Sequence, residues 1–156
     1  MTNATDFASQ SWDGAHTAKT RSAVQRSVTA LLDRLAPERA LKRVDQLQGP
    51  IEQHRTPNGC LLQAAACAVS VSWFPDSTKY SALGELHILV WQGTVTRRGA
   101  PKTAKNAALV SELILRPIES PADDALWLAK DGARYGTALL ADRCLELLAA
   151  QIEHQG

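Results

Sequence analysis

The spacing of apolar residues changes twice along this chain, and that change constrains the fold more than any other feature. Apolar residues first recur at helical spacing, then alternate with polar residues as in strands, and finally return to helical spacing. The helical stretches predict two N-terminal helices, at about 21–35 and 38–48, and a C-terminal helix at about 137–153. The alternating stretches predict five strands, at residues 51–56, 60–74, 84–97, 107–118 and 126–130.

This order of elements predicts an α+β fold. The connections on either side of the third strand are short and contain Gly or Pro, so we expect a five-stranded, mainly antiparallel, curved meander. The helices should pack on one face of this sheet. Residues 1–19 are expected to form a flexible tail, because they begin with a polar stretch. Residues 20–156 suit a single domain, and a hydrophobic content of 45% excludes disorder for most of the chain.

The charge and the cysteine content limit the classes of function that this chain can have. The chain has 17 basic and 16 acidic residues, so it is no general polycation for nucleic acid or membrane. Three cysteines without a Cys-x-x-Cys spacing favour reduced thiols and a cytoplasmic location. No apolar stretch approaches the roughly 20 residues that span a bilayer. The four histidines are scattered, and no glycine-rich phosphate loop follows a strand, so neither a metal site nor a cofactor is predicted.

Strand alternation separates the two faces of the predicted sheet. One face is ordinary core, which the helices should cover. Its residues come from three strands: Cys67, Val69, Val71, Trp73, Leu86, Ile88, Val90, Leu109, Leu113 and Leu115.

The opposite face mixes residue types that seldom occur together. Apolar side chains on one side of a sheet mark an interaction surface when they are exposed, whereas charged groups need partners when they are buried. This face combines Glu85, His87, Leu89, Trp91, Val110, Glu112, Ile114 and Arg116 with the small residues Ala66, Ala68, Ser70 and Ser72. It could be covered by a second copy of the chain, enclosed as a ligand cavity, or crossed by another segment of the same chain.

Five residues of that face are candidates for binding a ligand: Glu85, His87, Trp91, Glu112 and Arg116. Glu85 and His87 stand two apart on one strand, so the carboxylate can orient the imidazole for general-base chemistry near neutral pH. Arg116 could hold an anionic group in its guanidinium fork. The pattern contains no recognisable nucleophile, so whether the chain is an enzyme stays open.

A second candidate site is a basic loop between two predicted strands. Arg97, Arg98, Lys102 and Lys105 lie in a stretch from Leu86 to Ser111 that contains no acidic residue. Such a loop can contact phosphates, although it lacks aromatic residues on which bases would stack.

The leading hypothesis is a non-catalytic binding or assembly module that acts as a homodimer through the mixed face, with a small molecule or a protein as a further partner. One alternative is a small enzyme or ligand-binding protein with a pocket floored by the five candidates. Another is phosphate or nucleic-acid binding through the basic loop at residues 97–105. A membrane partner is not expected.

Overall fold

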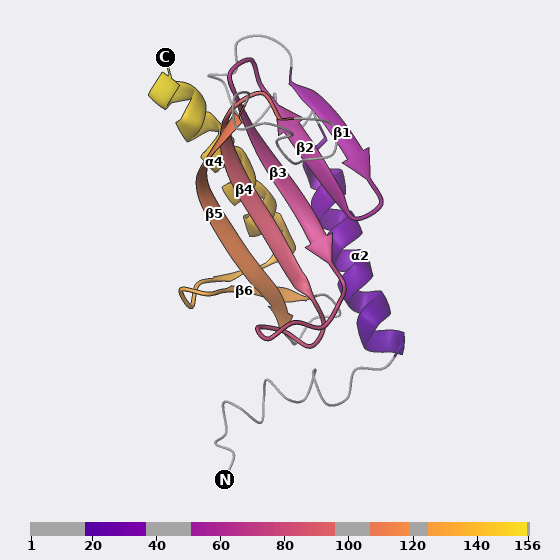
Figure 1. The fold of residues 1–156 in the computed structure, drawn as a ribbon. Coiled ribbons are helices and arrows are strands. Elements are labelled where there is room, and N and C mark those ends of the chain that lie inside the picture. Colours follow the sequence, from indigo (N-terminus) through magenta and orange to yellow (C-terminus); the bar gives the residue numbers. More distant parts are fainter. Residues whose placement is uncertain (1–17, 37–50, 96–106, 119–124, 156) are drawn as a thin grey trace.

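The computed structural model describes residues 18–36, 51–95, 107–118 and 125–155 (Figure 1). One helix precedes the sheet, α2 (Ala18–Arg34), and one follows it, α4 (Thr137–Gln155). Between them lie seven strands: β1 (Glu52–Thr56), β2 (Gly59–Gln63), β3 (Cys67–Phe74), β4 (Glu85–Gly93), β5 (Ala107–Ile118), β6 (Leu126–Ala129) and β7 (Arg134–Tyr135).

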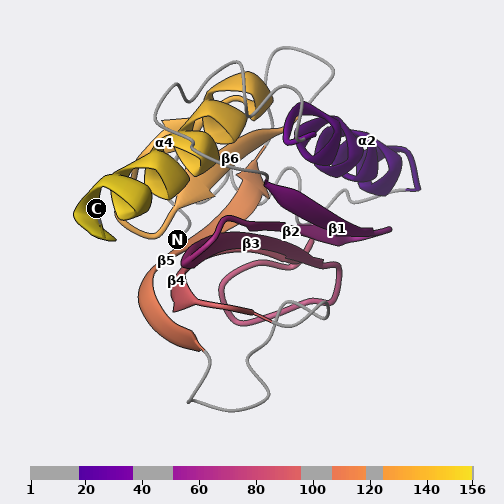
Figure 2. The same ribbon diagram turned by 90° about the horizontal axis from the view of Figure 1, so that it is seen from above.

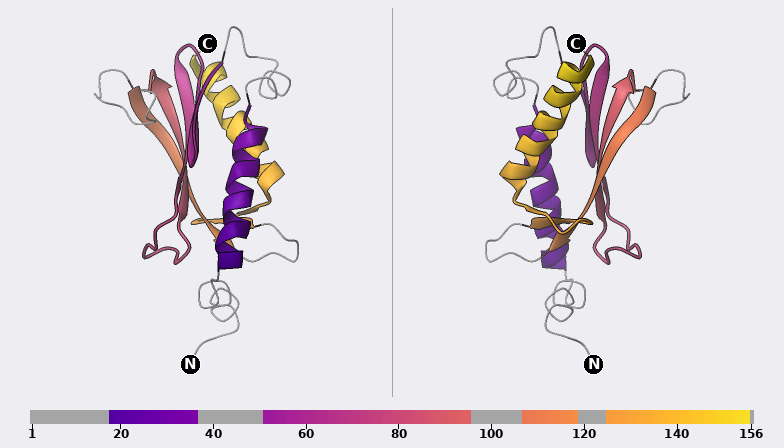
Figure 3. Two further views of the ribbon diagram at one scale, coloured as in Figure 1. Left: turned by 90° about the vertical axis from the view of Figure 1, so that its right-hand side faces the viewer. Right: turned by 90° about the vertical axis from the view of Figure 1, so that its left-hand side faces the viewer.

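The strands form one sheet in which sequence order is also spatial order. Each strand pairs antiparallel with the next, from β1 to β7. Both helices lie on the same side of this curved sheet, where α4 contacts β3, β4 and α2 (Figures 2 and 3). The predicted α+β meander with a C-terminal helix is therefore confirmed.

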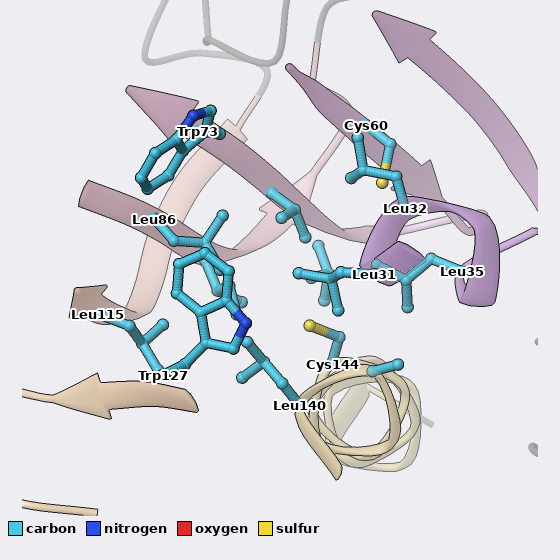
Figure 4. Close-up of a cluster of buried hydrophobic side chains, with 14 of the residues drawn as sticks. Leu31, Leu32, Leu35, Cys60, Trp73, Leu86, Leu115, Trp127, Leu140 and Cys144 are labelled. Atoms are coloured by element: carbon cyan, nitrogen blue, oxygen red, sulfur yellow. The ribbon is translucent and has the colours of Figure 1, made fainter. Parts of the chain in front are cut away.

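The main core lies between the two helices and the sheet. Val28 and Leu31 on α2, and Leu35 just after it, follow helical spacing and are fully buried, as are Leu140 and Leu148 on α4. Figure 4 shows these helices directing their side chains toward the sheet, where Trp73 and Trp127 meet edge to face with ring centroids 5.7 Å apart. The core face that alternation predicts on β3 and β4 is the face that packs here.

The prediction of five strands is wrong, because the stretch 60–74 is two strands rather than one. The chain reverses at Ala64–Ala66, where the Ala64 N–H donates to the Cys67 carbonyl at 2.9 Å. The Gly93 N–H on β4 donates to the Ala66 carbonyl at 2.7 Å and holds this turn in place. Ala66 therefore lies in a turn rather than on the mixed face. The two-residue strand β7 was not predicted.

Of the predicted pair of N-terminal helices, the described residues contain the first, α2. This helix begins at Ala18 rather than near residue 21. The second predicted helix, at 38–48, lies within 37–50, outside the described residues.

One β-bulge changes which residues share a face. Val90 pairs with Ser111 and Trp91 pairs with Leu109, so Val110 has no partner on β4. The extra residue places Leu109 on the side of Trp91, away from the helices. The prediction of Leu109 as a core residue is wrong for this reason, and its side chain is 49% exposed.

Candidate functional site

The side of the sheet turned away from α2 and α4, here called the open face, carries the candidate ligand-binding residues. His87 pairs with Ile114, and Leu89 pairs with Glu112. Because directly paired residues point to the same side, Glu85, His87 and Trp91 share this face with Glu112 and Arg116. In Figure 3 neither helix covers this side of the sheet.

The register spreads these residues along the face rather than gathering them into one group. His87 and Trp91 stand four residues apart on β4, which separates them by about 13 Å along the strand. The open face therefore has a Trp91 end and a Glu85 end, and each end has its own environment.

At the Trp91 end a second, smaller apolar cluster is buried on the open face. Trp91 is 6% exposed and packs with Leu61, Ala68, Val95 and Ala107. Its indole N–H donates to the Ser70 hydroxyl at 2.9 Å, across the β3–β4 pair. Trp91 is therefore an anchored part of the fold rather than a free ligand-stacking surface.

Gln63 holds together the backbone segments beside this cluster. Its amide nitrogen lies 2.7 Å from the Ala64 carbonyl, 3.1 Å from that of Cys67 and 3.1 Å from that of Gly93. Its amide oxygen accepts the Val95 N–H at 3.0 Å. One buried side chain thus joins the β2–β3 turn to the end of β4.

At the Glu85 end the predicted carboxylate–imidazole pair is present. The His87 Nε2 lies 3.0 Å from the Glu85 Oε1, with the side chains 32% and 14% exposed. The Phe74 ring packs against the imidazole at 4.7 Å between centroids. A hydrogen bond from Thr78 lowers the pKa of Glu85, against the opposing effect of burial, and His87 lowers it further. Glu85 is therefore a carboxylate at neutral pH and can orient the imidazole.

Arg116 lies at the same end of the sheet and stacks on Tyr80. Its guanidinium carbon lies 5.6 Å from the centroid of this ring, and the Lys130 ammonium lies 5.3 Å from it. The Tyr80 hydroxyl donates to the Leu128 carbonyl at 2.9 Å, which fixes the loop between β3 and β4 against β6. Arg116 and Lys130 thus form a basic spot beside the acidic Glu85.

The first half of β5 is the most exposed part of the open face. Leu109 and Val110 are 49% and 48% exposed, and Glu112 beyond them is also exposed. Figure 3 shows the start of β5 leaning away from the helices. An adjoining pair of half-exposed aliphatic side chains beside a buried tryptophan cluster is typical of an interaction surface.

Two further features concern catalysis: the position of Ser72 on the open face and the pKa values of the cysteine thiols. Sequence reasoning put Ser72 on this face but missed its position directly opposite His87, because alternation gives the faces of each strand and not the register between two strands. Within the described residues no hydrogen bond joins Ser72 to His87. Burial raises the pKa of all three thiols, that of Cys60 to about 12, which disfavours a thiolate nucleophile.

The other potential sites offer fewer structural observations that point to a function. The basic residues Arg97, Arg98, Lys102 and Lys105 lie in 96–106, outside the described residues. An open cavity of about 470 Å³ is lined by the outer side of α2 alone, including Gln25, Arg26 and Asp33. In the part of the chain that the structure describes, no three His, Cys, Asp or Glu side chains gather as a metal site. Neither described helix is long and apolar enough to cross a membrane.

Comparison of the chain with protein families, with curated proteins and with solved structures finds no match.

Proposed function

We propose that this protein is a non-catalytic binding and assembly module that acts as a homodimer through its open face. The observation that carries the proposal is the half-exposed pair Leu109 and Val110, which adjoins the buried Trp91 cluster on a face that no described helix covers. Burying these side chains against another surface is favourable by roughly 25 cal/mol for each Å² of apolar area removed from water.

A second copy of the chain is the partner that best fits the charges of this face. The face carries acids at Glu85 and Glu112 and a base at Arg116. In a two-fold dimer each copy presents the same patch, so charges of both signs can pair across the axis while the apolar residues meet. A strongly acidic or strongly basic partner would be repelled by the like charges in this mixture.

The experiment is light scattering on the wild type and on matched variants. The wild type should have twice the chain mass of 16.9 kDa. Val110→Lys should shift the protein toward monomer, because it places a charge in the contact. The control is Leu139→Lys on α4, where the leucine is 63% exposed and lies on the helix side of the sheet. Equal dimerisation of the two variants would reject the open face as the contact.

A small enzyme or ligand-binding site is a second candidate, favoured by the 3.0 Å contact between Glu85 and His87. Ser72, directly opposite His87 on β3, would supply the hydroxyl that acts as a nucleophile. Hydrolysis of p-nitrophenyl acetate by the wild type and by His87→Gln tests this candidate. It predicts faster turnover by the wild type, whereas equal rates reject esterase chemistry at this dyad.

A further inference from the structure

The outer edge of β5 is paired along only part of its length. β6 pairs with Leu115–Ile118, and the Lys130 N–H donates to the Ile114 carbonyl at 3.3 Å. From Ala107 to Leu113, here called the free edge, no described strand lies on the outer side of β5. Every residue from Ala108 to Glu112 is exposed, so the faces of this segment are as open as its edge.

Hydrogen-bond geometry shows which backbone groups this edge presents. In an antiparallel strand the N–H and C=O of one residue point to the same side, and successive residues alternate. The Ile114 carbonyl points outward, to Lys130. The N–H and C=O of Glu112, two residues earlier, therefore also point away from β4. Another β-strand can replace water as the partner of such outward donors and acceptors.

The opposite edge of the sheet is protected and this one is not. β1 is a five-residue strand carrying Glu52, His54 and Arg55, and Arg55 forms an ion pair with Asp33 on α2. Short length and charged side chains are the usual defences of an edge strand. The free edge of β5 has a single charged residue, Glu112, and exposes Leu109 and Val110.

We infer that the dimer forms by antiparallel pairing of the two free edges, so that residues 107–113 of each copy extend the sheet of the other. This inference rests on the proposed homodimer and places its contact along the edge of the open face, beside Leu109 and Val110, so that Glu85 and Arg116 lie outside it. Overlap of the segment with its own copy brings the two Val110 residues close together at the centre of the contact, at the bulge. Pairing with a second copy leaves neither free edge exposed, and it closes the assembly at two chains.

The test compares Glu112→Pro with Glu112→Ala by sedimentation equilibrium. Both variants lose the carboxylate, but only proline removes the outward N–H, and it leaves the ladder with β4 intact. Each contact contains this residue twice, so two lost hydrogen bonds should weaken dimerisation roughly 30-fold in the proline variant relative to the alanine variant. Circular dichroism of both variants checks that the sheet is retained.

A second measurement does not depend on the fold of the proline variant. Val110→Cys should form a disulfide-linked dimer under mild oxidation, because the two introduced thiols lie close together at the centre of the contact. Leu139→Cys, exposed on α4, should not. Edge pairing would be overturned if the wild type is a dimer, Glu112→Pro dimerises as tightly as Glu112→Ala, and Val110→Cys does not cross-link. This result would leave the proposed function standing. A monomeric wild type would overturn both the edge pairing and the proposed function. This outcome includes the case in which a β-strand of another protein occupies the edge.

Discussion

Replacing Gln63 with methionine should destabilise the fold more than any other single polar substitution on the open face. The side chain is 9% exposed, and its amide makes contacts to three carbonyls and one N–H. Methionine has a similar length and no hydrogen-bonding amide, so the substitution isolates these bonds from the packing of the side chain.

The size of the expected loss of stability depends on which hydrogen-bonding groups lose their partners. The Cys67 carbonyl keeps the Ala64 N–H, and the Ala64 carbonyl is near solvent. The Val95 N–H is left buried without a partner, and the Gly93 carbonyl loses one. One or two unsatisfied groups at about 1–3 kcal/mol each, together with the remaining lost bonds, give a destabilisation of about 3–4 kcal/mol.

Urea unfolding followed by circular dichroism, at one fixed protein concentration, measures this loss. Gln53→Met is the matched control, since the Gln53 amide makes one hydrogen bond, to the Leu35 carbonyl at 3.0 Å, from a half-buried position. It should cost about 1 kcal/mol. If Gln63→Met costs no more than Gln53→Met, the claim that Gln63 fixes the Trp91 end of the open face is refuted.

Three further outcomes are expected. A double-mutant cycle of Trp91→Phe and Ser70→Ala, read by urea unfolding, should give a coupling of about 1 kcal/mol, and a coupling near zero would contradict the indole–hydroxyl bond. Because Thr78 lowers the pKa of Glu85, the folded state favours the carboxylate; this stabilisation is complete above the ordinary pKa of 4.5 and is lost as the pH falls through the lower folded value. Glu85→Gln should therefore flatten the loss of stability in acid, and an unchanged pH profile would count against it. Burial and a pKa of about 12 should keep Cys60 unreactive toward iodoacetamide at pH 8 until urea unfolds the chain, and native-state alkylation monitored by mass spectrometry would contradict this.

Local periodicity was sufficient to predict the helix stripes and the faces of β4. Leu31 and Leu140 are buried because helical spacing gives each helix one apolar side, and His87 faces away from Ile88 because a strand alternates. The same alternation was enough to put Glu85, His87 and Trp91 on one face.

Features held by contacts between distant residues could not be predicted in this way. The turn at Ala64–Ala66 contains no Gly, Pro or Asn; it is held by Gln63 and by the Gly93 N–H from another strand. The bulge at Val110 leaves no mark in the sequence, yet it moves Leu109 from the core side to the open face. The packing of Val95 and Ala107 with Trp91 likewise joins residues that are distant in the sequence.

Sedimentation equilibrium of the unmodified protein across a concentration series tests the central claim most directly. The account predicts a reversible transition that ends at twice the 16.9 kDa chain mass. A mass that stays at that of a single chain up to several hundred micromolar would contradict it.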